Sequence, residues 1–391
     1  MGRAVRILVE CPALIASVKV GVLEPLKPLE HQGKCEVGFK ETIKITRKDI
    51  AWCDILICVR GCELATLKIV QAAKNAGRFI IYFLDDDLLN VPLQVSSGDY
   101  FGRQALKQSL ITCIENSDIL WCVNKLIGEK YSAYCGNKWV LSKVPIAITS
   151  AHLGKYGINI LYAGSKDHEI NVQKYISPVV KKLCEEFRDI KFTFIGANPN
   201  LEDYSNVTYI KFIENYDDYK KLVNNGCFCI GIAIINTSEF YKYKYYNKFV
   251  EYTSIGAVGV YTKSEPYSLI IKDGENGLLC DNNFNEWYNA IRTLIIDKEL
   301  RGKCLFNAQE KLKKEFNHEV IANNLEENIP QLSKFYAANV NYKNIKSLDI
   351  KKYIYFHRLK FLTKKYGILI VFLLPFKVMK MLFKVLKNKG S

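Results

Sequence analysis

The feature that most constrains the fold is a series of short apolar segments separated by helix-like stretches. In the first half of the 391-residue chain these segments lie at 5–9, 54–59, 78–84, 118–123 and 138–141. Strands that are apolar on both faces are typical of parallel sheets covered by helices on both sides. Residues 63–76 have a helical pattern that ends at Gly77, and glycine commonly follows a helix. The first half is therefore predicted to be a parallel α/β domain.

The same pattern starts again after a short polar segment at 148–156, which we interpret as a linker. Further apolar runs follow at 159–162, 191–195, 207–210, 227–235, 258–261 and 277–280, and helical patterns at 284–296 and 298–316. We expect an α/β protein with two doubly wound, Rossmann-like domains facing each other across a cleft. The predicted domains are 1–150 and 157–338, followed by a basic amphipathic C-terminal tail at 339–391.

The predicted topology also indicates where a ligand binds. In open parallel sheets, ligands bind outside the carboxyl ends of the strands. Two such sheets in one chain place these ends at the cleft between the domains. The loops expected there are 85–87, 164–168, 196–198 and 245–251.

The charge distribution separates the tail from the rest of the chain. The net charge is +15, and residues 341–391 contribute 13 Lys or Arg against one acid, or +12. The preceding residues are therefore close to neutral, whereas a nucleic-acid-binding domain should carry a basic face. We predict no nucleic-acid partner for the body of the protein.

The cysteines indicate the compartment. There are 13 of them, scattered, and Cys11, Cys58, Cys122, Cys227 and Cys229 lie inside apolar runs, as small buried hydrophobic residues do. The odd count and the strand-like start, in place of a secretory signal, favour reduced thiols and a cytoplasmic protein.

The segment 246–260 carries the most chemical information. A helix is expected to begin near Asn247, a good N-cap residue, and to end before Gly256. Lys248 and Glu251 then share one face of this helix. A helix N-terminus beside a lysine can bind an anion, and a carboxylate one turn later can accept hydrogen bonds from ribose hydroxyls. A solvated Lys–Glu pair on an amphipathic helix is the alternative.

This segment resembles the donor-binding segment of retaining glycosyltransferases of the GT-B fold, the group 1 (family 4-like) enzymes, which commonly read N-K-x-x-E-Y-x-x-x-G-x-P-V. Residues 161–168 resemble the start of their second domain, and residues 270–279 resemble a later loop. The resemblance covers roughly 157–316, is looser over the first domain and does not include the tail.

The resemblance implies a binding site for a nucleotide-sugar. Lys248 would bind the diphosphate, and Glu251 the ribose hydroxyls. Backbone N–H groups of the loop at Gly164 and Ser165 would approach the phosphates. The implied donor-binding residues are Gly164, Ser165, His168, Asn247, Lys248 and Glu251. For His168, a merely polar loop histidine is the alternative.

The sequence departs from the family pattern at several positions, two of which lie close to Glu251. Many relatives carry a further glutamate eight residues before Glu251, and this chain has Tyr243 there. Val258 replaces the proline before the following strand. The first departure concerns a contact that the relatives usually make with the transferred sugar.

Three consecutive acids, Asp85, Asp86 and Asp87, follow a predicted strand of the first domain. Such a triplet can bind a divalent metal through hard oxygen ligands. The GT-B resemblance favours instead an acceptor-side role, in which the carboxylates bind sugar hydroxyls. Solvated acids at a helix N-terminus are the third possibility. We expect no metal and no cofactor.

We therefore predict a glycosyltransferase that moves a sugar from a UDP- or GDP-linked donor to a hydroxyl of a lipid-linked or surface-polysaccharide acceptor. The resemblance implies retention at the anomeric carbon. Lys248 and Asp86 are the expected catalytic residues. A catalytically inactive GT-B scaffold is the first alternative, favoured by Tyr243. A nucleotide-binding oxidoreductase or epimerase is the second, but the first strand lacks a Gly-x-Gly-x-x-Gly fingerprint.

The tail combines basic residues with apolar ones at helical spacing over 343–365, followed by an uncharged run at 366–376. Crossing a bilayer needs about 20 apolar residues. A transmembrane helix and a helix packed across both domains are possible. We favour an interfacial helix that binds an anionic membrane and places the protein at the inner face of the membrane.

Overall fold

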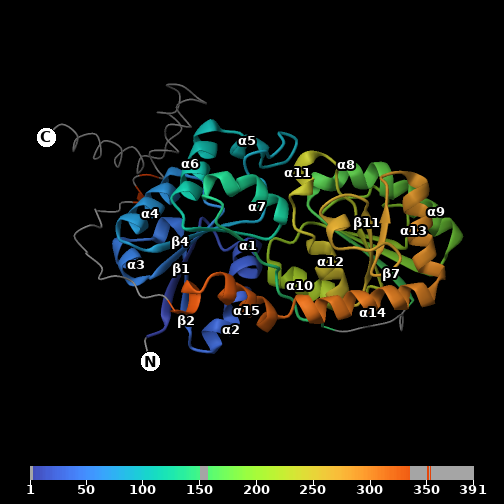
Figure 1. The fold of residues 1–391 in the computed structure, drawn as a ribbon. Coiled ribbons are helices and arrows are strands. Elements are labelled where there is room, and N and C mark those ends of the chain that lie inside the picture. The colour runs from blue at the N-terminus through green and yellow to red at the C-terminus, as the bar shows by residue number, and fades with distance from the viewer. Residues whose placement is uncertain (1–2, 150–156, 335–349, 352, 354–391) are drawn as a thin grey trace, which may run out of the picture.

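The protein consists of two lobes, each built on a parallel sheet of six strands (Figure 1). The computed structural model describes residues 3–149, 157–334, 350, 351 and 353. In both sheets every pair of neighbouring strands is parallel. The predicted fold class, two doubly wound Rossmann-like domains, is therefore confirmed.

The first sheet contains the five predicted strands and one that the sequence pattern did not indicate. Its order is β2-β1-β3-β4-β5-β6, with β1 Val5–Cys11, β2 Cys35–Glu41, β3 Ile55–Val59, β4 Phe79–Leu84, β5 Ile119–Cys122 and β6 Trp139–Leu141. Strand β2 was missed because it lies at the sheet edge and is half exposed, so its sequence mixes polar and apolar residues.

Helices cover both faces of the first sheet. They are α1 Ala16–Val18, α2 Glu24–His31, α3 Arg47–Trp52, α4 Leu64–Asn75, α5 Gly98–Phe101, α6 Gln104–Glu115 and α7 Lys125–Tyr131. Successive residues of a strand point to opposite faces, so Leu8 and Val9 belong to two different core clusters. Helix α4 ends as predicted, with Gly77 at φ +69°.

The second sheet has the order β12-β11-β10-β7-β8-β9. Its strands are β7 Ile158–Ala163, β8 Ile190–Ile195, β9 Val207–Ile210, β10 Ile230–Ala233, β11 Val258–Thr262 and β12 Leu278–Cys280. Its main helices are α8 Glu169–Asn171, α9 Ser177–Glu186, α10 Tyr216–Asn225, α11 Glu239–Lys242, α12 Asn247–Ser254, α13 Phe284–Ile296 and α14 Lys298–Glu315.

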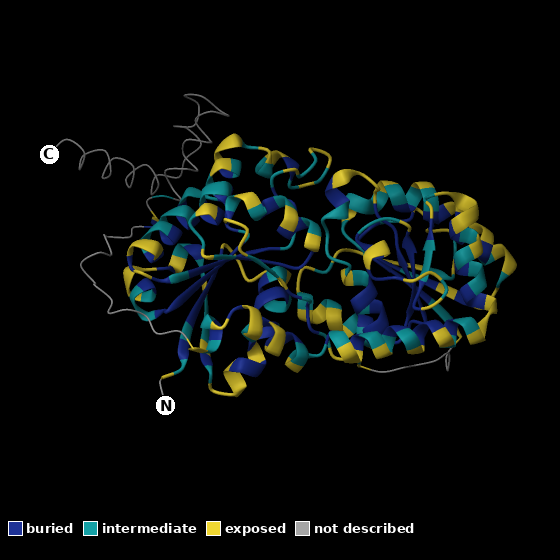
Figure 2. Cartoon of the chain, in the orientation of Figure 1, coloured by how far each residue is buried: buried dark blue, intermediate teal, exposed yellow. Residues whose placement is uncertain are grey.

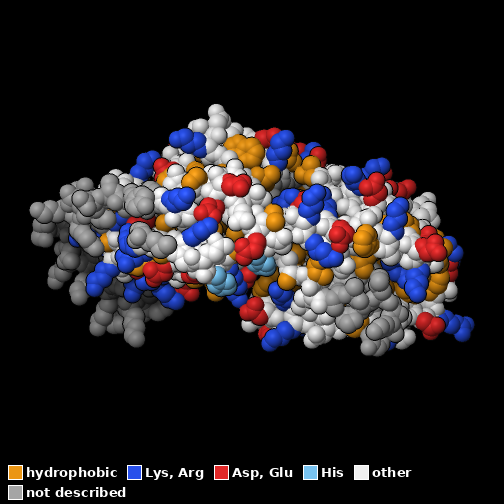
Figure 3. Space-filling view, turned by 60° about the horizontal axis from the view of Figure 1, so that its bottom comes forward, with side chains coloured by type: hydrophobic (Ala, Val, Ile, Leu, Met, Phe, Trp, Pro, Cys, Tyr) orange, Lys and Arg blue, Asp and Glu red, His pale blue; other side chains and the backbone are white. Residues whose placement is uncertain are grey.

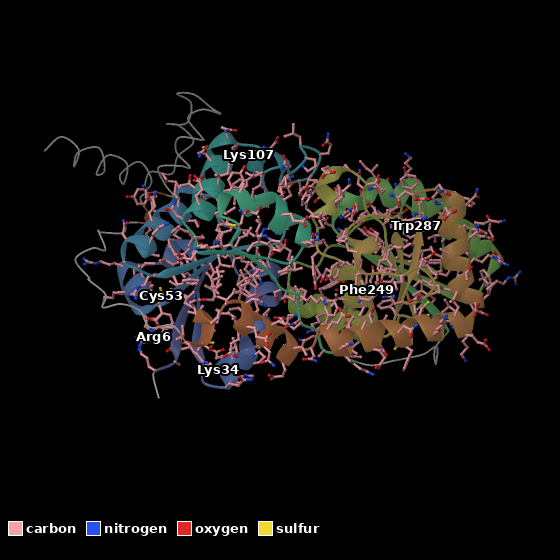
Figure 4. The ribbon with its side chains drawn as sticks, viewed as in Figure 1. Arg6, Lys34, Cys53, Lys107, Phe249 and Trp287 are labelled. Carbon is pink, nitrogen blue, oxygen red and sulfur yellow. The ribbon has the colours of Figure 1, made fainter. Side chains whose placement is uncertain are left out.

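The second sheet separates two core clusters, and buried residues follow the sheets in both lobes (Figure 2). Phe249 of α12 lies in one cluster and Trp287 of α13 in the other, and both side chains are fully buried (Figure 4). This packing fixes α12, the helix that carries the predicted donor-binding pair.

The C-terminal helices of the described chain return to the first lobe. Helix α15, His318–Asn328, packs against α2, and α16, Gln331–Lys334, follows it (Figure 1). Ile321, Leu325 and Ile329 are buried in a core cluster of the first lobe. The prediction assigned residues 157–338 to the second domain. In the structure α15 packs on the first lobe instead, because its apolar face completes the core there.

Most of the predicted tail lies outside the described residues. Ile350 is only 3% exposed and belongs to a core cluster of the first lobe, and Tyr353 packs against the same cluster. Within the described ranges, no helix is long and apolar enough to cross a membrane. The membrane role of the tail therefore stays a prediction.

All 13 cysteines are free, and 11 of them are buried. Cys11, Cys58, Cys122 and Cys229 are buried as expected. Cys227 differs, because it lies before β10 in a loop with φ +51° and is only partly buried.

Candidate active site

Residues 241–246 of the second lobe, which comprise the end of α11 and the loop after it, contact the first lobe and are here called the strap. The side-chain amide of Asn124, at the start of α7, donates to the carbonyl oxygens of Lys242 (3.0 Å) and Lys244 (2.8 Å). The Asn124 oxygen also accepts from the Leu126 N–H, so one side chain caps α7 and holds the strap. The strap leads directly into α12.

Two cavities lie at the carboxyl ends of the strands, between the lobes. The smaller has a volume of about 300 Å³, and its polar lining includes Ser17, Asp85, Asp86, His168, Lys244, Asn247 and Lys248. The larger has a volume of about 640 Å³ and is lined by residues that include Leu14, Ile15, Lys19, Gly164, Ser165, His168, Phe212, Glu214, Tyr219 and Lys248. Ala16, His168, Tyr216 and Lys248 line both, so the cavities adjoin there.

Lys248 lies at this junction and is held by two neighbours. Its ammonium group forms an ion pair with Glu251 and donates to the Tyr219 hydroxyl at 3.0 Å. The same Nζ lies 5.4 Å from the ring centroid of Tyr219 and 5.8 Å from that of Tyr252. A charge held by a carboxylate and two rings is oriented before a ligand arrives.

Glu251 stands behind Lys248, with 12% of its side chain exposed. Of the predicted donor residues, Gly164, Ser165, His168, Asn247 and Lys248 line one or both cavities, whereas Glu251 lines neither. The structure therefore brings the predicted pair together but turns the carboxylate toward the lysine.

The start of α12 differs from the expectation that Asn247 is its N-cap. The helix begins at Asn247, and the capping position is Tyr246, whose side chain makes no capping hydrogen bond. Asn247 instead lines the smaller cavity. The end of the helix agrees with the prediction, because Gly256 follows it with φ +85°.

Gly164 and Gly196 lie side by side at the ends of β7 and β8. The Gly164 N–H donates to Ile195 O at 3.0 Å. A β-carbon added to Gly196 would lie 2.0 Å from Gly164 O, and Gly196 has φ +91°. Only glycine permits this close approach, which lies beside the larger cavity that Gly164 lines.

Asp85 and Asp86 follow β4 and reach the smaller cavity. The Arg60 guanidinium contacts Asp85 at 2.9 Å and Asp86 at 3.0 Å. Lys244 of the strap lies 3.4 Å from Asp86, so this ion pair joins the two lobes. Burial raises the pKa of Asp85.

The structure separates Asp87 from the other two acids. Its side chain is fully buried and lines neither of the two cavities. Lys130 contacts it at 2.6 Å, and the Tyr131 hydroxyl donates to it at 2.7 Å. This environment indicates that Asp87 fixes α7 against β4, in contrast to its predicted acceptor-side role.

Tyr243, which replaces the glutamate common in the group 1 enzymes that this segment resembles, contacts the first lobe. The Lys130 ammonium lies 4.2 Å from its ring centroid, and the ring packs against a first-lobe core cluster. Tyr243 is therefore part of the strap anchor and does not line either of the two cavities.

Sequence reasoning missed four residues of this site: Arg60, Tyr219, Lys244 and Asn124. Arg60 directly follows β3, so the rule that pointed to Asp85 at the end of β4 could also have indicated it. The other three act across segments distant in sequence, and no local pattern pairs them. Among the described residues, no group of three or more His, Cys, Asp or Glu is arranged to hold a metal.

Basic and acidic side chains are interspersed on the face of the described structure in Figure 3. This distribution agrees with the near-neutral charge of the chain outside its tail. It differs from the continuous basic surface typical of nucleic-acid binding.

Comparison with known proteins places the chain in a structural class. No family model matches the sequence, and no curated protein matches it. Solved structures do match. Anabaena Alr3699/HepE in complex with UDP and glucose has a TM-score of 0.59 at 14% identity, over 85% of this chain and all of that one.

Two further structures match over similar lengths. Sucrose-phosphate synthase of Thermosynechococcus elongatus has a TM-score of 0.60 at 13% identity, over 84% of this chain and 99% of that chain. A proposed UDP-N-acetylglucosamine 2-epimerase of Listeria monocytogenes has a TM-score of 0.56 at 12% identity, over 86% of this chain and all of that chain. The chain has the GT-B fold, as the resemblance implied.

Proposed function

We propose that the protein is a glycosyltransferase that uses a nucleotide-sugar donor. The observation that supports this most is the pair of adjoining cavities at the strand ends, which meet at Lys248 and His168. A nucleotide-sugar likewise has two parts joined by a diphosphate. The HepE structure with UDP and glucose, which shares the fold, supports the same assignment.

We propose one orientation of the donor in the two cavities. The nucleoside would occupy the larger cavity, where Gly164 and Ser165 offer backbone groups and Phe212 offers an apolar ring. The sugar would occupy the smaller cavity, beside Asp86 and Lys244. The diphosphate would then lie against Lys248. We propose UDP or GDP as the nucleotide.

The reaction needs stabilisation of the negative charge that develops on the leaving diphosphate. Lys248 is a fixed positive charge at this position, and the uncapped first turn of α12 adds a partial positive charge. If Glu251 turns toward the ribose, Tyr219 still holds Lys248. When the donor binds, Glu251 would thus exchange Lys248 for the ribose hydroxyls as its partner.

The acceptor would approach from the first lobe, where Asp85 and Asp86 face the smaller cavity. Each of these carboxylates already contacts a cationic side chain. We propose that Asp86 accepts a hydrogen bond from the acceptor hydroxyl and that no metal takes part. Activity should therefore survive EDTA; complete loss, restored by manganese or magnesium, would contradict this.

The proposed function has a direct test. Purified protein is screened for thermal stabilisation against UDP- and GDP-sugars, because a ligand at 100 times its Kd adds about 2.7 kcal/mol of stability. The stabilising donor is then offered with candidate acceptors, and release of free UDP or GDP is measured. Stabilisation by no nucleotide-sugar would contradict the proposal.

An inactive GT-B scaffold is the alternative, because Tyr243 replaces a glutamate that relatives use at the sugar. Such a scaffold would bind a donor but release no nucleoside diphosphate with any acceptor.

We also propose that the acceptor is lipid-linked or a surface polysaccharide and that the reaction retains the anomeric configuration. A separate proposal concerns the tail, which would dock the protein on the cytoplasmic face of an anionic membrane. The tail carries most of the net positive charge. Full-length protein should sediment with anionic vesicles at low salt. A protein ending at residue 353, which keeps Ile350 and Tyr353 in place, should not. Equal sedimentation of both would contradict the docking.

A further inference from the structure

His168 lines both cavities, so it can contact a ligand that fills both. It ends a short 3-10 turn, Lys166–His168, and its backbone N–H donates to Ser165 O at 3.1 Å. Its ring lies 5.6 Å from the Tyr241 ring, at an interplanar angle of 58°. Lys248 is its charged neighbour at the junction of the cavities.

The two ring nitrogens of His168 have different surroundings. Nδ1 is enclosed and has no hydrogen-bond partner among the described residues, whereas Nε2 is not enclosed in this way. A buried N–H without an acceptor is rarer in proteins than a buried acceptor that lacks a donor. The proton is therefore better placed on Nε2, where water or a ligand in the cavity can accept from it.

A second proton on this ring is disfavoured. Burial lowers the pKa of His168 to about 4, and the positive charges of Lys244 and Lys248 act in the same direction. Asp167 acts in the opposite direction, but its carboxylate is engaged by the first lobe. It accepts from the Ser96 N–H at 3.0 Å and from the Ser96 hydroxyl at 3.3 Å. The ring is therefore neutral at pH 7.

We infer that His168 is held as the neutral Nε2–H tautomer and donates one hydrogen bond to an oxygen of the donor where sugar and diphosphate join. This inference rests on the proposed function. As the bond between the anomeric carbon and the phosphate oxygen breaks, a bond forms between that carbon and the acceptor oxygen. The electron pair of the broken bond stays on the leaving diphosphate, and the proton of the acceptor hydroxyl passes to a diphosphate oxygen. Lys248 supplies the charge that balances it. His168 adds a hydrogen bond and keeps its proton.

Substitutions can separate the two nitrogens. The amide nitrogen of His168→Gln reaches about as far as Nε2, whereas that of His168→Asn reaches only about as far as Nδ1. His168→Gln should therefore retain most of the turnover. His168→Asn and His168→Ala should lower kcat about tenfold to a hundredfold, as loss of one charge-assisted hydrogen bond does. Equal activity of the Asn and Gln variants would overturn the inference.

A spectroscopic measurement tests the tautomer without any substrate. In wild-type protein labelled with ¹⁵N, the imidazole shifts of His168, assigned by comparison with His168→Gln, should show protonated Nε2 and unprotonated Nδ1 from pH 5.5 to 8. A protonated Nδ1 at pH 7, alone or as imidazolium, would overturn the inference even if a variant fails to fold. If no nucleotide-sugar binds the wild type, the proposed function is wrong. The ¹⁵N shifts alone then decide whether His168 is the Nε2–H tautomer.

Discussion

Burial distinguishes Lys248 from a surface lysine that has the same spacing from a glutamate. Lys272 and Glu275 have the same i, i+3 spacing as Lys248 and Glu251, but the Lys272 side chain is 79% exposed against 22% for Lys248. Because burial and two tyrosine rings orient Lys248, its charge is available at a fixed point of the cavity wall.

Replacement of Lys248 should therefore affect turnover more than stability. Lys248→Met keeps an apolar stem between the rings but removes the charge, and we expect kcat to fall at least tenfold, since a charged hydrogen bond contributes about 1.5–3 kcal/mol. Lys272→Met is the matched control and should leave kcat unchanged. Nucleoside diphosphate release and thermal unfolding measure both. A large drop in Tm with normal turnover would show that Lys248 is structural.

Glu10 has no role in the proposed reaction but should govern the pH dependence of stability. Its side chain is fully buried on β1, accepts from Thr42 and Thr66, and leaves one carboxyl oxygen without a partner. Burial raises its pKa to about 7, and hydrogen bonds from Thr42 and Thr66 oppose this only in part. The folded state thus holds a proton that the unfolded chain releases near pH 4.5.

The sign of the effect follows from this difference. The protonated carboxyl contributes its full stability below about pH 4.5, and this contribution is lost as the pH rises through about 7. The free energy of unfolding should fall by roughly 3 kcal/mol across this window. Glu10→Gln, which mimics the protonated form, should remove most of the fall in urea denaturation. An unchanged pH profile in Glu10→Gln would contradict the assignment.

At the scale of elements, the ends of β7 and β8 depend on one glycine. Gly196→Ala would place a methyl group 2.0 Å from Gly164 O, at φ +91°. The backbone must then shift, so we expect a loss of several kcal/mol of stability or a displaced loop with weaker donor binding.

Gly274→Ala is the matched control for this prediction. Gly274 has a similar φ of +70° but nothing within 4 Å of an added β-carbon. The Gly274→Ala variant should lose only about 1–2 kcal/mol of stability, through backbone strain. Denaturant unfolding and donor affinity of the two variants give the comparison. Equal losses would show that the contact with Gly164 is unimportant.

At the scale of the whole molecule, the C-terminal helices pass from the second lobe to the first. The chain leaves the second lobe after α14, and α15 then buries Ile321, Leu325 and Ile329 in the core of the first lobe. Each such side chain contributes about 1.5–3 kcal/mol when fully buried. Removal of α15 and α16 should therefore unfold the first lobe.

Two shortened proteins test this. A protein ending at residue 353, which keeps Ile350 in the first-lobe core, should unfold cooperatively and still bind the donor. A protein ending at residue 316 should aggregate or bind a hydrophobic dye, because it exposes the first core. Normal unfolding of the shorter protein would show that α15 is dispensable.

The sequence alone determined most of the architecture. Apolar strands of both sheets could be recognised because a parallel strand covered on both faces is apolar throughout, and Gly77 and Gly256 marked the ends of helices. The pairing of Lys248 with Glu251 also followed from local spacing on one helix. These features depend on residues close in the chain, so a local pattern contains them.

The tertiary structure alone decided which charged groups meet at the cleft and which are buried beside it. Asp86 contacts Arg60 and Lys244, whereas its neighbour Asp87 turns into the first lobe toward Lys130. Adjacent residues at a strand end point in different directions, and their partners come from segments tens of residues away. Local sequence patterns do not encode such contacts, because they form only when strand ends, strap and helix α7 pack together.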